Sequence, residues 1–348
     1  MADAIFAIPG DIAAKTGGYA YDRRLLELLP AQGLNVRHAR LPDSFPFPSA
    51  ADLAATAQAL AATPSGSAIL FDGLAYGALP ADLIRAIERP IVAIVHHPLS
   101  YEPGPSDGQR RAFLDSERRA LAVADAVVVS SSTTRGVLAA EFGVNESRIA
   151  VAEPGTERVP RARGSSDVPS LLAVGAVSVR KGYGVLVDAL AGIANRPWTA
   201  TVVGTLDRDP ETAAGLARRI AQHGLTERIP LAGEVADDAL SMLYDTADIF
   251  LMPSLYEGYG MALAEAMARG LPIVCTTGGA AAETAPGGAA LKVPPGDTAA
   301  FGAATARLLD DAALRKTVAD TSWRAGQELP NWDQTAVVVA RVVRGVLR

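Results

Sequence analysis

Glu257 and Glu265 are separated by seven residues, within the stretch 252–283 whose sequence is MPSLYEGYGMALAEAMARGLPIVCTTGGAAAE. An ionised carboxylate accepts two or more hydrogen bonds from hydroxyl groups, so this pair suits a ligand that carries many hydroxyls, such as a sugar. The alternative is two solvated glutamates on an ordinary helix surface, and an isolated pair would favour that alternative. The residues between the two glutamates decide between these interpretations.

The segment between the two glutamates predicts a phosphate site. Its glycines let the backbone approach a ligand closely. The N-terminus of the helix that follows carries free N–H groups and about half a positive charge, which favours a phosphate. At a rise of ~1.5 Å per residue, Glu265 lies roughly 6–8 Å from the helix start, about the distance from a diphosphate to the hydroxyls of a ribose. The residues expected around the phosphates are Gly258, Tyr259, Gly260, Met261 and Ala262.

The same stretch resembles the signature of the family 4 retaining glycosyltransferases, which have the GT-B fold. Their pattern is E-G-[FY]-G-x-x-x-x-E-A-M-A-x-G-x-P, and residues 257–272 match it at every specified position. The resemblance covers nearly the whole chain and is strongest over residues 171–297. It implies that Glu257 holds the transferred sugar, that Glu265 holds the ribose, and that no protein nucleophile is used.

The elements that must position these residues alternate between strands and helices. Short apolar runs at 4–9, 67–72 and 90–95 indicate buried parallel strands. The resemblance implies an α/β fold with two Rossmann-like, doubly wound domains that face each other across a cleft. The polar, proline-bounded segment after residue 158 indicates the domain boundary. We expect an acceptor-binding domain over 1–163, a nucleotide-sugar-binding domain over 164–325, and a terminal helix over 326–348 that returns to the first domain.

Candidate residues of the first domain lie after two of its strands. In open α/β sheets the ligand crevice lies at the carboxyl ends of the strands, where His96 is placed. A satisfied turn histidine is the alternative. The resemblance implies that Gly17 and Gly18 face the donor phosphate and the acceptor, and that His96 lies near the transferred sugar. His97 stands where many members of the family have an aspartate.

Candidate residues of the second domain include two cations at a glycine turn. Arg180 and Lys181 would clamp a diphosphate by adding charge to backbone N–H contacts. The resemblance matches Lys181 to a lysine–glycine pair of the family. Where the family often has an arginine after the strand glycine, this chain has Ala176, so either Arg180 substitutes or the site is weaker. The resemblance also implies that Val235 contacts the nucleotide base.

Composition excludes several classes of protein. A net charge of −6 and a pI of about 5.4 give no indication of nucleic-acid binding. Four histidines and one cysteine lack the spacing of a zinc site, and we expect no metal and no cofactor. The chain starts directly with a strand and without a signal peptide, which indicates a cytoplasmic protein. Acids interrupt the arginine cluster at 110–119, so we expect at most peripheral contact with the inner face of a membrane.

The activity that the resemblance implies is hexosyl transfer from a nucleotide diphosphate sugar to an acceptor hydroxyl, with retention and without a metal. Glu257, His96 and Lys181 would act at the reacting centre. The sugar and the base stay open, and the acceptor could be a glycan, a lipid-linked sugar or a small metabolite. The main alternative is a nucleotide-sugar isomerase or epimerase of the same fold that needs no acceptor.

Two further alternatives come from other classes of protein. A dinucleotide-dependent oxidoreductase should show G-x-G-x-x-G after its first strand, and the glycines at 10, 17 and 18 lack that spacing. A nucleotide-sugar-binding partner without activity would not need both glutamates and Lys181.

Overall fold

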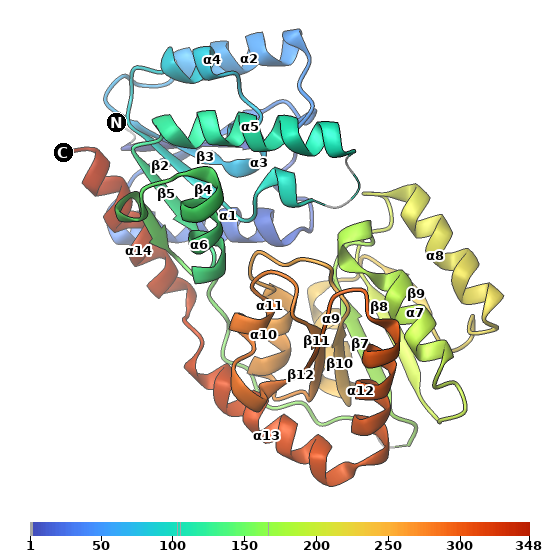
Figure 1. Ribbon diagram of the computed structural model, residues 1–348. Coiled ribbons are helices and arrows are strands. Elements are labelled where there is room, and N and C mark those ends of the chain that lie inside the picture. The colour runs from blue at the N-terminus through green and yellow to red at the C-terminus, as the bar shows by residue number, and fades with distance from the viewer. Residues whose placement is uncertain (1–2, 103, 105, 166) are drawn as a thin grey trace. The chain divides into compact units, whose positions relative to one another are not determined.

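The computed structural model describes residues 3–102, 104, 106–165 and 167–348 (Figure 1). The chain divides into two units. The first consists of Met1–Gly155 together with Pro330–Arg348, and the second of Thr156–Leu329. Each unit is built around a parallel sheet of its own.

The first unit contains a six-stranded parallel sheet in the order β2-β1-β3-β4-β5-β6. Its strands are β1 (Ala4–Pro9), β2 (Val36–Leu41), β3 (Ala68–Asp72), β4 (Ile91–Val95), β5 (Ala126–Val129) and β6 (Ile149–Val151). Four of them, β1, β3, β4 and β5, are buried along their whole length, because helices cover both faces of a parallel sheet. The apolar side chains on these strands form the core of the unit.

The connections of the first unit are mostly helical. The helices are α1 (Gly17–Leu28), α2 (Ala50–Ala61), α3 (Gly73–Tyr76), α4 (Ala81–Arg85), α5 (Asp107–Val123), α6 (Ser132–Phe142) and α14 (Trp332–Val346). Short 3₁₀ turns lie at η1 (Pro30–Gln32), η2 (Leu99–Tyr101) and η3 (Glu146–Arg148). In Figure 1, α2, α4 and α5 lie on one side of the sheet, and α1 and α14 lie on the other.

The second unit contains another six-stranded parallel sheet, in the order β12-β11-β10-β7-β8-β9. Its strands are β7 (Ser170–Val174), β8 (Thr199–Val203), β9 (Leu231–Gly233), β10 (Ile249–Met252), β11 (Ile273–Thr276) and β12 (Leu291–Val293). Its helices are α7 (Tyr183–Ala191), α8 (Pro210–Gln222), α9 (Asp237–Thr246), α10 (Met261–Ala268), α11 (Ala281–Thr284), α12 (Thr298–Asp310) and α13 (Ala312–Glu328). The 3₁₀ turns are η4 (Val179–Lys181) and η5 (Gly287–Ala289).

The last helix, α14, packs on the first unit. The Thr335 hydroxyl donates a hydrogen bond of 2.6 Å to the carbonyl oxygen of Glu153. A Cβ atom at Gly155 would overlap the backbone of Trp332, so the two segments touch directly. The chain therefore leaves the second unit at Leu329 and ends on the first.

The first change of unit falls at Gly155, whereas the sequence analysis placed the boundary at residue 163. Hydrogen bonds explain this difference. The N–H of Ala162 donates to the carbonyl of Arg269, and the N–H of Arg163 donates to the carbonyl of Asp245, each at 2.9 Å. These bonds attach the polar segment to the second unit. The second change of unit falls at Leu329, where the sequence analysis had residue 325.

The predicted α/β fold is confirmed, since two parallel sheets alternate along the chain with the helices that connect their strands. Within the described residues, no helix combines the length and the apolar character needed to cross a bilayer.

Candidate active site

The helix that follows β10 begins as the sequence analysis predicted. All four residues of β10 are buried, and α10 begins at Met261 after a loop that ends at Gly260. Gly260 has a φ of 99°, a left-handed conformation that suits a residue without a Cβ atom. As at any helix start, the N–H groups of Met261 and Ala262 have no carbonyl of their own helix to bind. These N–H groups therefore lie at the positive end of the dipole of α10.

Glu257 is held by two cations and a hydroxyl. The residue is only 5% exposed, and Oε1 accepts hydrogen bonds from Lys181 Nζ at 2.7 Å and from the Ser254 hydroxyl at 2.6 Å. Arg180 Nη1 lies 3.4 Å from Oε2. Burial alone would raise the pKa of Glu257, but the charges of Lys181 and Arg180 outweigh it and lower the pKa to about 2. Glu257 is therefore ionised at neutral pH.

Backbone contacts fix the position of Glu257. Its N–H donates to the carbonyl of Gly278 at 3.2 Å, and its carbonyl accepts from the N–H of Ala280 at 2.8 Å. Gly279 has a φ of +62°, and a Cβ atom there would overlap the Glu257 carbonyl. The Gly278–Gly279 pair is therefore required for the close approach of these two backbone segments. Neither glycine is among the site residues predicted from the sequence.

The loop that carries the cations contacts the loop that carries Glu257. The N–H of Leu255 donates to the carbonyl of Arg180 at 2.7 Å, and Arg180 Nη1 donates to the carbonyl of Tyr256 at 2.9 Å. A Cβ atom at Gly182 would overlap the carbonyl of Pro253. The structure thus brings Arg180, Lys181 and Glu257 together in an ion-paired group, a contact that the sequence did not predict.

Glu265 lies on α10 and contacts a tyrosine that the sequence analysis missed. The Tyr244 hydroxyl donates to Glu265 Oε2 at 2.9 Å, and Arg269 lies 4.5 Å over the Tyr244 ring. Burial raises the pKa of Glu265. Val235 is half-buried and packs on the same apolar cluster as Tyr244. Glu265 therefore contacts Tyr244 directly, and Val235 packs on the apolar cluster to which Tyr244 belongs.

In the first unit the structure brings Gly18 and His96 together. Gly17 and Gly18 open α1, where the Thr16 side chain accepts a hydrogen bond from the N–H of Tyr19. A Cβ atom at Gly18 would lie 3.1 Å from His96 Cδ2, so the helix start packs against the histidine ring. Because Gly18 has no Cβ atom, the start of α1 can approach the His96 ring this closely.

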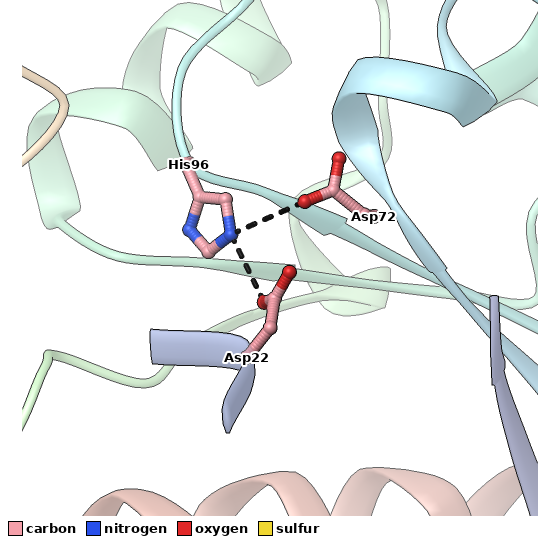
Figure 2. A group of neighbouring side chains, drawn as sticks. All are labelled: Asp22, Asp72 and His96. Carbon is pink, nitrogen blue, oxygen red and sulfur yellow. Dashed lines mark hydrogen bonds and ion pairs between the residues drawn. The ribbon is translucent and has the colours of Figure 1, made fainter. Parts of the chain in front are cut away.

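His96 also contacts two acids that the sequence analysis did not name as site residues (Figure 2). Its Nε2 lies 3.1 Å from Asp22 Oδ1 and 3.7 Å from Asp72 Oδ2. Burial raises the pKa of Asp22 to about 7 and raises the pKa of Asp72 well above its usual value. Burial also lowers the pKa of His96.

Two local signals could have indicated these acids. Asp72 ends a buried strand, and Asp22 precedes Leu25 and Leu26 by three and four residues, the spacing of one helix face. His97 has a different acidic neighbour, since its Nε2 lies 2.8 Å from Glu102 Oε2.

Within the described part of the chain, one group brings three potential metal-ligating atoms within 4.8 Å of one another, and it is Asp22, Asp72 and His96. Asp207 and Asp209, whose spacing resembles that of a metal-binding pair, lie in a loop. Asp209 caps α8 by accepting a hydrogen bond of 3.0 Å from the N–H of Thr212.

Comparisons with known proteins match both units. Residues 168–311 match the family described as glycosyl transferases group 1, and residues 68–158 match glycosyltransferase family 4. A curated relative is the MMP alpha-(1->4)-mannosyltransferase of Mycolicibacterium hassiacum, 26% identical over 73% of this chain and 64% of its own length. The chain spans 38% to 64% of the length of three of the curated relatives it matches.

Solved structures match the whole length of the chain. Sucrose-phosphate synthase from Thermosynechococcus elongatus has a TM-score of 0.84 and 23% identity, over 98% of each chain. The Anabaena protein HepE, solved in complex with UDP and glucose, has a TM-score of 0.77 and 19% identity, over 99% of this chain and 100% of its own. The likeness of both units to these proteins shows the fold. Each unit thus matches a glycosyltransferase family model, and the chain has the GT-B fold.

Proposed function

We propose that the protein transfers a hexosyl group from a nucleotide diphosphate sugar to an acceptor hydroxyl, with retention of the anomeric configuration and without a metal. The observation that carries this proposal is the convergence of Lys181 and Arg180 on the Glu257 carboxylate, in the loop that enters α10. Two cations that could bind a diphosphate therefore lie beside a carboxylate that could accept hydrogen bonds from sugar hydroxyls.

The diphosphate would bind between these cations and the start of α10. Two cations and a helix N-terminus supply positive charge where the leaving group develops negative charge. This is why the proposal needs no metal. The backbone from Gly258 to Ala262 would line the phosphates, and Tyr259 is already buried there. In the free protein Lys181 forms an ion pair with Glu257, so in the complex Lys181 would contact both Glu257 and the diphosphate.

The two glutamates would bind hydroxyl groups. With a pKa of about 2 and hydrogen bonds from Lys181 and Ser254, the Glu257 carboxylate is weakly basic, which suits hydroxyl binding better than nucleophilic attack. Glu265 would hold the ribose and Val235 would contact the base. The complex of HepE with UDP and glucose supports a donor of this chemical class.

In the first unit, His96 would orient a substrate hydroxyl, with Gly17 and Gly18 beside it. The acceptor stays open between a glycan, a lipid-linked sugar and a small metabolite. We also propose that the protein is cytoplasmic, with at most peripheral membrane contact and no nucleic-acid partner.

The donor can be tested by thermal melting with UDP, GDP, ADP and their hexose conjugates. A ligand at 100 times its Kd stabilises the folded protein by ~2.7 kcal/mol, so the true donor should raise the melting temperature clearly. If none of these nucleotides raises the melting temperature, the donor proposal is wrong.

The catalytic assignment is tested with Lys181→Ala and Glu257→Ala in an assay of donor turnover. Each should lower turnover by at least ~10²-fold, the usual effect of losing a charged contact to the transition state. The matched control is Lys316→Ala, since Lys316 pairs with Asp320 at 2.6 Å but is 77% exposed. Near-normal turnover in both site variants would remove the assignment. Turnover that yields an altered sugar nucleotide without an acceptor would instead indicate an isomerase.

A further inference from the structure

We infer that Thr284 is a positioning residue of the proposed donor site. Its hydroxyl holds the peptide group between Tyr259 and Gly260 in the orientation that leaves the N–H of Gly260 available to a phosphate oxygen. The identity of the ligand rests on the proposed function, whereas the orientation of the peptide group rests on contacts within the second unit.

The hydroxyl of Thr284 binds a carbonyl in the loop that enters α10. Thr284 ends α11, which lies beside α10, and the residue is 5% exposed. Its hydroxyl donates a hydrogen bond of 2.6 Å to the carbonyl oxygen of Tyr259. A threonine in a helix often donates to the carbonyl four residues earlier, as Thr305 does to Phe301 in α12. The Thr284 hydroxyl instead links α11 to a segment 25 positions earlier in the chain.

A second hydrogen bond fixes the same side of the loop. The carbonyl of Glu257 accepts from the N–H of Ala280, directly before α11, at 2.8 Å. This carbonyl and that of Tyr259 therefore both face α11. A trans peptide group points its C=O and its N–H in opposite directions. The N–H groups of Gly258 and Gly260 belong to the same two peptide groups, so they point away from α11.

The N–H of Gly260 adds a donor to those at the start of α10. Within the residues that the structure describes, it donates to no backbone carbonyl. The next two N–H groups, those of Met261 and Ala262, have no carbonyl of their own helix to bind. If the peptide group before Gly260 were reversed, a carbonyl oxygen would replace this donor and would repel a phosphate. The orientation of one peptide group therefore matters for binding a diphosphate.

The local backbone does not fix this orientation by itself. Gly260 has a φ of 99°, and a glycine adopts positive and negative φ values almost equally well, so the peptide group before it can rotate at low cost. The carbonyl of Tyr259 belongs to a residue that is only 6% exposed, and a buried carbonyl without a donor is unfavourable. The Thr284 hydroxyl supplies that donor, and it does so only in the observed orientation.

The competing interpretation is that Thr284 only fastens α11 to the loop and stabilises the fold. Removal of the hydroxyl would then weaken the binding of every part of the nucleotide to a similar extent. If Thr284 positions the peptide group, the loss is confined to ligands that carry phosphates. A comparison of a nucleoside diphosphate with its nucleoside distinguishes the two interpretations.

The test is titration of the full-length protein followed by NMR, which measures tight and weak binding alike. The probes are whichever of UDP, GDP and ADP binds the wild type, and the corresponding nucleoside without phosphates. Thr284→Val, which removes the hydroxyl, should raise the Kd of the nucleoside diphosphate by at least ~10-fold, the usual effect of losing a hydrogen bond to a charged group. The Kd of the nucleoside should stay unchanged, and Thr284→Ser should keep both values close to those of the wild type.

Thr305→Val is the matched control, since Thr305 is a buried threonine of the same unit whose hydroxyl also donates to a carbonyl, at 2.9 Å. It should change neither Kd. An unchanged Kd of the diphosphate in Thr284→Val, or an equal loss for the diphosphate and the nucleoside, would overturn the inference. If Thr284→Val does not fold, Thr284→Ala gives the same comparison.

Crystal structures without ligand provide a second measurement. The Tyr259 carbonyl should face Thr284 in the wild type, and the peptide group before Gly260 should be rotated or occupy two orientations in Thr284→Val. An unchanged peptide group in the variant would overturn the inference. If no nucleoside diphosphate binds the wild type, the proposed function is wrong, and these two crystal structures still decide the role of Thr284.

Discussion

Replacing Lys181 with methionine should destabilise the second unit by about 2 kcal/mol at pH 7, because it leaves the buried carboxylate of Glu257 with less compensating charge. The structure sets this magnitude. The pKa of Glu257 is about 2, against an ordinary value of 4.5, and each pKa unit corresponds to about 1.4 kcal/mol, so the favourable contribution of its partners exceeds the cost of burial by about 3 kcal/mol. Lys181 contributes the largest part of that, while Arg180 and Ser254 remain.

The pH dependence has a definite sign. Since folding lowers the pKa of Glu257, the stabilisation is fully present above pH 4.5 and is lost as the pH falls toward 2. The difference in the free energy of unfolding between Lys181→Met and the wild type should therefore be constant from pH 7 to pH 5. Below pH 5 this difference should shrink. The double variant Lys181→Met/Glu257→Gln should be more stable than Lys181→Met at pH 7, because a neutral glutamine replaces a buried carboxylate that has lost its nearest cation.

The measurement is urea unfolding of the full chain followed by circular dichroism. A chain of two units can unfold in two steps, so the midpoint of each step is compared between variants. Lys316→Met is the control, and loss of its exposed pair should cost less than about 1 kcal/mol. Lys181→Met should not lose as little stability as Lys316→Met at pH 7, and its loss of stability relative to the wild type should not grow as the pH falls. Either result would refute the role of Lys181 as the main partner of Glu257.

Two further predictions concern the second unit. Tyr244→Phe should raise the Kd of the donor nucleoside diphosphate by about 3- to 10-fold, since Glu265 loses a hydrogen bond that orients it. Calorimetry with the 2′,3′-dideoxy nucleotide should show no such difference, and an equal loss with both nucleotides would contradict a role through the ribose. Gly279→Ala should destabilise the protein by about 3 kcal/mol or more, because its φ is +62° and the added methyl meets the Glu257 carbonyl. A thermal melt within a degree or two of the wild type would show that this backbone contact is not required.

The local sequence determined the kind of fold and one half of the site. Buried apolar strands that alternate with helices predict a parallel α/β sheet, because burial on both faces leaves a short continuous apolar run. The glycine at 260 and the helix that follows predict an anion-binding helix start, because that site is made by backbone groups of one short segment. Glu257 and Glu265 belong to the same segment, so the sequence alone gives the spacing between them.

Tertiary structure alone decided which distant side chains meet. Lys181 and Glu257 are 76 positions apart, and His96 and Asp22 are 74 positions apart, so no local pattern records either contact. His96 and His97 are neighbours in the chain with different acidic partners, because successive side chains point to different sides of the backbone. The carboxyl pair beside His96 exists only because the end of a strand and one face of a helix are packed together with water excluded.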